Sequence, residues 1–328
     1  MTAPTVPIAN PAADAIGHSV RLGDATVFYG EVVGLSRVSL AFAPGITGIV
    51  GPNGSGKTTM MRLLVGLVQP QEGTVNVLGG DPFKDEEIRT RISFVPATEC
   101  FYDNVSGHTN LEAAFVARGE TRKAAKQLAD EALELVKLTA DGKRAYRTWS
   151  RGMRQRLKLG LALASSSDLV LLDEPFLGVD PPSRRQLRGH IDKLGKQGKV
   201  VVVSSHVLHE VEALTDRVGV LAHGRLLGFG NAEEILREVR DQHPQRLQIE
   251  VADARAFAAI LLRLPHIREV KVEGERRLTF VTEDPEAAFK EIAEVVVESE
   301  APIYSLQSLD DTLEAVFAQV TSTGTHRL

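Results

Sequence analysis

Hydrophobic and polar residues alternate in the first part of the chain in the way that β-strands require. Between about residues 20 and 80, apolar side chains recur at every second position, with turn residues at Gly23, at Gly30 and at 43–45. Such alternation is typical of strands with one buried face. A glycine-rich stretch divides this region, and the apolar spacing after it predicts a helix. The apolar positions of that helix are Met60, Met61, Leu63, Leu64 and Leu67.

The middle of the chain combines helical periodicity with short, wholly apolar runs. Residues 98–147 have a helical pattern, in which 121–138 form one predicted helix and Asn110 is a candidate cap for another. Residues 169–172 and 200–203 are apolar throughout, as in strands that are covered on both faces of a parallel sheet. Helices that alternate with buried strands predict an α/β core whose sheet is mainly parallel.

The order of elements changes near residue 246. From there the pattern predicts strand, helix, two strands, helix and strand, and Asp253 is placed to cap the first helix. This is the order of the ferredoxin-like motif. We expect a small α+β accessory domain at 246–328, a boundary in the polar stretch 238–245 and a last helix at 310–320. The predicted elements of the motif are 247–251, 254–262, 269–272, 277–281, 285–297 and 303–306.

Composition narrows the class of protein. A chain of 328 residues with 43% hydrophobic and 25% charged residues is typical of a soluble protein with about two domains. The net charge of −5 argues against a dedicated nucleic-acid binder, so we expect no nucleic-acid partner. The single cysteine, Cys100, excludes an intrachain disulfide and fits a reducing compartment.

Neither a membrane span nor a secretion signal is visible in the sequence. No stretch approaches the roughly 18 uninterrupted apolar residues that a membrane span needs. Residues 1–18 are rich in alanine and proline and lack a basic segment followed by an apolar core, so we interpret them as a disordered leader.

The glycine-rich stretch carries the first chemical signal. Residues 51–58 read G-P-N-G-S-G-K-T and lie between an apolar run and the predicted helix. The glycines let successive N–H groups point at phosphate oxygens, and the helix N-terminus adds its positive dipole end. Lys57 can reach the β- and γ-phosphates, while the Thr58 hydroxyl is placed to ligate Mg²⁺. The sequence therefore predicts a nucleoside triphosphate site made of Gly51, Pro52, Asn53, Gly54, Ser55, Gly56, Lys57, Thr58 and Thr59.

Two adjacent acids, Asp173 and Glu174, follow the apolar run 169–172. In a phosphate-loop fold the first acid lies beside Thr58 and holds Mg²⁺, usually through water, and the second is free to polarise the attacking water. Paired acids at a strand end are often no more than a solvated terminus. Their position after a phosphate loop favours the catalytic interpretation.

Five motifs in this order and spacing resemble an ABC-transporter ATPase over about residues 20–240. They are the phosphate loop, W-S-R-G-M at 149–153, the acid pair, G-V-D at 178–180 and S-S-H at 204–206. The S-R-G-M sequence and the tail at 309–317 are most similar to the type-two exporter subfamily. The resemblance implies a P-loop NTPase (ABC ATPase) domain at 19–240, with an antiparallel β subdomain and a helical subdomain at about 98–150.

The resemblance also implies roles for individual residues. Tyr29 matches the aromatic residue that stacks on adenine, and His206 the histidine that contacts the γ-phosphate. Ser150 and Gly152 match the signature, which caps the γ-phosphate of an ATP held by a second subunit. Asp180 matches the acid that links the two nucleotide sites.

The activity implied is ATP hydrolysis with Lys57, Glu174 and His206 as catalytic residues and with Mg²⁺ held by Thr58 and Asp173. Two copies, or this chain and a related ATPase, would close head to tail over two Mg²⁺-ATP. They would drive a separately encoded permease from the cytoplasmic side of the cell membrane, as a peripheral subunit. Phe101 and Tyr102 are candidates for contacting the permease, although packing inside the helical subdomain explains them equally well.

One position departs from the family pattern. Ala97 follows Phe94-Val95-Pro96, where the family has a glutamine that contacts Mg²⁺ and water. Either Thr98 or Glu99 replaces that glutamine, or hydrolysis is slow, which is the interpretation we favour. Two alternatives to an exporter subunit remain open. One is a soluble ABC ATPase that acts on ribosomes or nucleic acid. The other, which Ala97 favours, is a regulatory ATP-binding subunit with weak hydrolysis.

Overall fold

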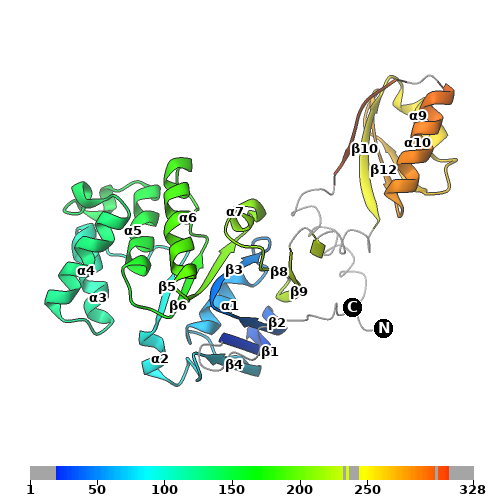
Figure 1. The fold of residues 1–328 in the computed structure, drawn as a ribbon. Coiled ribbons are helices and arrows are strands. Elements are labelled where there is room, and N and C mark those ends of the chain that lie inside the picture. The colour runs from blue at the N-terminus through cyan, green and yellow to red at the C-terminus, as the bar shows by residue number, and fades with distance from the viewer. Residues whose placement is uncertain (1–19, 232–233, 236–243, 300–301, 310–328) are drawn as a thin grey trace. The chain divides into compact units, whose positions relative to one another are not determined.

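The computed structural model describes residues 20–231, 234–235, 244–299 and 302–309. They form two compact units that divide between residues 232 and 233, and each unit has its own sheets and helices (Figure 1). The leader predicted at 1–18 and the helix predicted at 310–320 lie outside the described residues. No helix in the described part of the chain is both long enough and apolar enough to cross a membrane.

A six-stranded sheet forms the centre of the first unit. Its strand order is β5-β6-β7-β3-β8-β9, and every neighbouring pair runs parallel except β8 and β9. The mainly parallel sheet predicted from the apolar runs is therefore confirmed. Its strands are β3 (Gly45–Val50), β5 (Ile92–Val95), β6 (Leu169–Asp173), β7 (Val200–Ser205), β8 (Val218–Ala222) and β9 (Arg225–Gly230).

Both faces of this sheet are covered, which explains why residues 169–172 of β6 and 200–203 of β7 are all apolar. Val170 and Leu172 face one hydrophobic core, while Leu169 and Leu171 face the other. The first core includes residues of α4, α5 and α6, and the second includes residues of α1 and the antiparallel sheet. The helices are α1 (Lys57–Leu64), α2 (Glu86–Thr90), α3 (Gly107–Ala117), α4 (Arg122–Leu135), α5 (Arg151–Leu163), α6 (Pro181–Lys196) and α7 (Leu208–Glu212).

An antiparallel sheet of order β2-β1-β4 makes up the predicted β subdomain. Gly23, which we expected at a turn, instead lies inside β1, where the pairing register shifts between Leu22 and Ala25. A Cβ at Gly23 would lie 2.7 Å from the Thr74 hydroxyl, so the glycine permits close pairing and does not end the strand. The strands are β1 (Val20–Tyr29), β2 (Val32–Phe42) and β4 (Glu72–Val77).

Helices α3 and α4 pack against each other and, with the short 3₁₀ turns Thr139–Asp141 and Tyr146–Thr148, form the helical part of the unit (Figure 1). Ser106, not Asn110, caps α3, because its hydroxyl accepts from the Thr109 N–H. Asn110 lies inside that helix, where its side-chain amide pairs with both backbone groups of Tyr102 at 2.8 and 2.9 Å.

One further expectation about a buried residue is wrong. Leu67, predicted on the buried side of α1, is 65% exposed, because α1 ends at Leu64 and the chain turns away. Met60, Met61, Leu63 and Leu64 are buried as predicted.

The second unit has the ferredoxin-like order predicted for it. Its antiparallel sheet has the order β11-β12-β10-β13, and both helices share one hydrophobic core with the same sheet face. Asp253 caps the first helix as predicted, since its carboxylate accepts from the N–H groups of Arg255 and Ala256. The elements are β10 (Gln245–Val251), α9 (Ala254–Leu261), β11 (Ile267–Val272), β12 (Arg277–Thr282), α10 (Pro285–Ser299) and β13 (Ile303–Ser308).

Candidate active site

The glycine-rich loop connects the carboxyl end of β3 to the start of α1. A Cβ at Gly51 would lie 2.2 Å from the Leu221 carbonyl oxygen, and a Cβ at Gly56 would lie 2.6 Å from the Gly34 carbonyl oxygen. Gly56 also has a φ of 106°, which side chains rarely tolerate. Glycine is thus required for the close packing that places the first turn of α1 at the strand end.

The start of α1 has the features of an anion site. Gly56 is its N-cap and supplies no side-chain hydrogen bond, and no acidic residue lies in the first turn. The N–H groups there are left for an acceptor from outside the helix, at the positive end of its dipole. Above the loop, a Cβ at Gly54 would meet no atom within 4 Å, so the loop is open at that point. These residues, with Asn53 and Pro52 in the same loop, fit a nucleotide phosphate.

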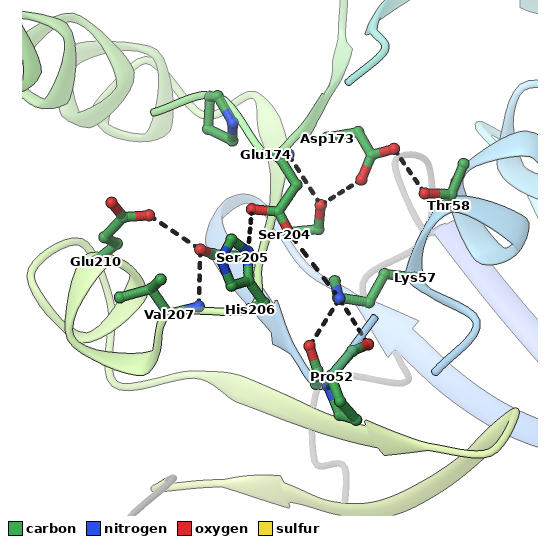
Figure 2. Close-up of polar contacts among 12 residues, drawn as sticks. Pro52, Lys57, Thr58, Asp173, Glu174, Ser204, Ser205, His206, Val207 and Glu210 are labelled. Carbon is green, nitrogen blue, oxygen red and sulfur yellow. Dashed lines mark hydrogen bonds and ion pairs between the residues drawn. The ribbon is translucent and has the colours of Figure 1, made fainter. Parts of the chain in front are cut away.

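Lys57 is the buried cation of this loop. Its ammonium donates to the carbonyl oxygens of Gly51 at 2.7 Å and Pro52 at 3.0 Å, and lies 3.8 Å from Glu174 Oε1 (Figure 2). Burial lowers the pKa of Lys57, while the nearby carboxylates of Glu174 and Asp173 partly oppose that shift. The positive charge is therefore fixed between the loop and the acid pair.

Asp173 connects the loop to the sheet. Its Oδ2 accepts from the Thr58 hydroxyl at 2.8 Å, and its Oδ1 accepts from the Ser204 hydroxyl at 2.6 Å (Figure 2). Asp173 and Ser204 are partners in the parallel register of β6 and β7, so the two strands end side by side. The carboxyl ends of the strands are where ligands bind in open α/β folds.

A hydroxyl and a carboxylate fit Mg²⁺, which takes oxygen ligands and usually keeps several waters alongside one or two carboxylates and substrate phosphates. Among the described residues there is no group of three or more His, Cys, Asp or Glu side chains that could hold a metal ion by itself. Thr58 and Asp173 therefore suit a magnesium ion that arrives with a phosphate group.

Glu174 lies next to this pair and faces His206. Its Oε2 is 2.9 Å from His206 Nδ1 (Figure 2). Its φ is 51°, an uncommon value for a side chain other than glycine, and such strain concentrates at functional sites. Gln155, which is buried in α5, donates from its amide to the carbonyl oxygens of Glu174 and Pro175 at 3.2 and 3.1 Å and so supports the bend.

Tyr29 ends β1 near the loop and is 42% exposed. A Cβ built on Gly34 would lie 2.9 Å from its ring and 3.0 Å from the Thr59 methyl group. Both side chains thus flank Gly34, and the exposed ring lies close to the first turn of α1, which contains Thr59.

Ser150, Gly152 and Asp180 form a second group. Ser150 caps α5 and Asp180 caps α6, and each side chain accepts from the backbone N–H three residues further on. The bond from the Ser183 N–H lowers the pKa of Asp180. A Cβ at Gly152 would lie 3.0 Å from the Gly178 carbonyl oxygen, so the two motifs are adjacent. Within the described residues, no hydrogen bond or ion pair joins this group to Lys57 or Glu174.

Sequence reasoning missed three side chains of this region. Gln155 and Lys158 are buried polar residues three positions apart on α5, and Glu210 accepts from the Ser205 hydroxyl at 2.9 Å. The sequence signal that could have found the first two is the presence of polar residues among the apolar positions of α5. Nothing in the spacing singled out Glu210.

Comparison with known proteins agrees with this fold and site. The family model described as ABC transporter matches residues 35–177. The bacitracin transport ATP-binding protein of Enterococcus faecalis is 31% identical over 75% of this chain and 78% of the relative. The linearmycin resistance ATP-binding protein of Bacillus subtilis (strain 168) is 29% identical over 89% and 95%. The chain therefore belongs to the ATP-binding proteins of ABC transporters.

A solved structure has the same fold as the first unit. It is a dimeric ATP-binding cassette in a post-hydrolysis state bound to ADP and Pi. The TM-score is 0.60 at 24% identity, and the match covers 65% of this chain and 98% of the other.

Proposed function

We propose that the chain is the ATP-hydrolysing subunit of a membrane exporter. One observation carries the hydrolytic assignment: the Glu174 carboxylate lies between His206 and the Lys57 ammonium, directly beside the Thr58–Asp173 pair. A carboxylate in that position can accept a proton from water next to a bound γ-phosphate.

In the proposed reaction, Lys57 and the backbone N–H groups of the loop neutralise charge on the transferred phosphoryl group. Glu174 orients the attacking water and takes its proton, and His206 holds the Glu174 carboxylate in place and contacts the γ-phosphate. Mg²⁺, when held by Thr58 and Asp173, supplies further charge neutralisation at the phosphates. Tyr29 stacks on the adenine.

The second group of residues supports a head-to-tail dimer. Ser150 and Asp180 are exposed and Gly152 is partly so, and none contacts Lys57 or Glu174 among the described residues. We infer that they act on an ATP bound by a second subunit, either another copy of this chain or a related ATPase. The dimeric arrangement of the similar solved cassette supports this inference.

The partner we propose is a separately encoded permease at the cytoplasmic side of the cell membrane. The names of the relatives, which refer to bacitracin transport and linearmycin resistance, support export of a small molecule. Tyr102 is 74% exposed and is available for a partner, whereas Phe101 packs edge-on against Tyr146. Both line a cavity of about 630 Å³ beside α3, which we propose as the contact region.

Ala97 favours a second candidate, a regulatory subunit with weak hydrolysis. Of the two residues that follow, Glu99 is already engaged, because its carboxylate accepts from the Tyr146 hydroxyl at 2.6 Å, whereas Thr98 lines the same cavity as Thr58 and Asp173. The complete set of Lys57, Glu174 and His206 favours the first candidate.

The test measures Mg²⁺-dependent ATP hydrolysis by the purified chain, together with the proteins that copurify from detergent-solubilised host membranes. Hydrolysis and a stoichiometric polytopic membrane protein are expected. A chain that binds ATP but hydrolyses none, even with that partner, would leave the regulatory candidate. Recovery with ribosomes or DNA would contradict both.

A further inference from the structure

Lys158 in α5 is a buried cation for which the reaction above has no use. Its side chain is 2% exposed, and its ammonium donates to three successive carbonyl oxygens, those of Pro96 at 3.0 Å, Ala97 at 3.3 Å and Thr98 at 3.1 Å. No ion pair of Lys158 occurs among the described residues. A buried charge is costly unless it is hydrogen-bonded, and here the carbonyl oxygens occupy all three donor positions.

Those carbonyls belong to the segment that follows β5 and contains Ala97. The segment lines the cavity of about 630 Å³, whose lining also includes Thr58 and Asp173 as well as Ala113 and Ala117 of α3. The methyl group of Ala97 cannot make a polar contact with any of them. The hydrogen bond from Lys158 to the Ala97 carbonyl oxygen therefore supplies a polar link between residue 97 and the rest of the unit.

Helix α5 holds a second loop in the same way. Gln155 lies one turn before Lys158, is also buried, and donates to the carbonyl oxygens of Glu174 and Pro175. One helix thus donates hydrogen bonds to the backbones that follow β5 and β6, and the signature residue Ser150 caps the start of the same helix.

A second contact joins the same parts of the unit. Glu99, next to the Lys158-bound carbonyls, accepts from Tyr146, whose ring lies 5.9 Å from that of Trp149, centroid to centroid. Trp149 immediately precedes Ser150. The segment after β5 is therefore tied to both the middle and the start of α5.

We propose that Lys158 is a positioning residue that compensates for alanine at position 97. By fixing the backbone of 96–98 to α5, it makes that segment, the Glu174 bend and the signature move together when nucleotide binds. This inference rests on the proposed ATP hydrolysis.

The first experiment compares steady-state hydrolysis by the full-length wild-type chain with that of Lys158→Met and Lys158→Arg. Lys158→Met is expected to lower kcat about tenfold and to leave the KM for ATP within about twofold, because the loop and Tyr29 are untouched. Arginine can still donate to the carbonyls and should restore most of the rate. Lys199→Met is the matched control, since Lys199 also donates to a backbone carbonyl, that of Ser165, from a partly buried site.

A double-mutant cycle supplies a readout that a purely structural role would not change. The cavity beside Ala97 has room for a glutamine side chain, so Ala97→Gln should raise kcat more in the Lys158→Met background than in the wild type. An equal effect in both backgrounds would show that the two positions act independently and would overturn the inference. If Lys158→Met does not fold, Lys158→Gln takes its place, and an unchanged kcat there has the same meaning.

The outcomes for the two proposals are distinct. A wild-type chain without Mg²⁺-dependent hydrolysis would contradict the proposed function and this inference with it. A wild-type chain that hydrolyses ATP, with Lys158→Met at the same kcat, would contradict the inference alone.

Discussion

The two units differ in what they bury besides apolar side chains. The first buries polar and charged groups at the carboxyl ends of its parallel strands, among them Lys57, Asp173 and Ser204. In the described part of the second unit, Thr282 is the one polar residue that is buried as a whole, and its hydroxyl accepts from the Asp284 N–H at 3.1 Å in the turn before α10; one carboxylate oxygen of Glu291 is also buried. Because buried charges are expensive, their concentration in one unit indicates where chemistry occurs. The described part of the second unit has an almost entirely apolar interior, without a comparable concentration of buried charge.

The largest expected effect is that of Glu174→Gln. It should lower kcat at least about 100-fold, because the amide cannot take a proton from water, while ATP affinity stays within a few-fold. Equilibrium nucleotide binding and single-turnover hydrolysis separate the two quantities.

The matched control lies in the other unit. Glu291 is a partly buried glutamate of α10, and its Oε1 lies 3.6 Å from His266 Nε2. Glu291→Gln should leave hydrolysis unchanged. If Glu174→Gln hydrolyses ATP at the wild-type rate, the assignment of the base is wrong.

A truncation in the hydrophobic core of the second unit tests whether its stability and ATP hydrolysis are independent. Phe280→Ala in β12 removes a ring from the hydrophobic core of that unit and should destabilise it by about 3–5 kcal/mol, measured by denaturant unfolding. ATP hydrolysis should persist, because the units have separate cores. Val281→Ala, on the other face of the same strand, should cost far less. Parallel loss of hydrolysis and of second-unit stability would show that the two units are not independent in stability and activity.

Two neighbouring serines of the first unit differ in the carboxylate to which each one bonds. Ser204 and Ser205 are both fully buried, but only Ser204 bonds to Asp173, whereas Ser205 bonds to Glu210. Ser204→Ala should lower kcat about tenfold and raise the Mg²⁺ concentration for half-maximal rate, since a lost buried hydrogen bond costs about 1–3 kcal/mol. Ser205→Ala should change the rate by less than about threefold. Equal effects would contradict the assigned metal site.

The smallest effect concerns stability at alkaline pH. Burial, with the hydrogen bond to Glu99 second, raises the pKa of Tyr146. The folded chain therefore keeps this proton above about pH 10, where an unfolded tyrosine loses it, so the stabilisation is present below that pH and declines above it. Tyr146→Phe should cost about 1 kcal/mol at neutral pH and make the alkaline decline shallower, as measured by unfolding at both pH values. Tyr304→Phe, at an exposed tyrosine of the second unit, should do neither.

Much of this architecture could be predicted from the sequence because its signals are local. Apolar runs identified β6 and β7, and the order of elements identified the ferredoxin-like unit. The hydrogen bonds from Lys158 to the carbonyl oxygens of residues 96–98 could not be predicted. They join residues about sixty positions apart, and every residue type has the backbone carbonyl that accepts them. Likewise, asparagine is a residue type that often caps helices, and only the tertiary structure shows that Asn110 pairs with the backbone of Tyr102 instead.

The aligned ends of β6 and β7 have a consequence for how such a protein diverges. Asp173 and Ser204 are the points at which buried strands become a polar edge, and after β6 the hydrophobic core resumes only at Phe176 and Val179. Substitutions of the polar residues beyond these points can therefore alter rate and partner response while the core residues, and with them the sheet, remain intact. A library that randomises the polar residues after each strand end and keeps Phe176 and Val179 would sample new behaviour from folded proteins, whereas one that randomises the strands would mostly sample unfolded chains.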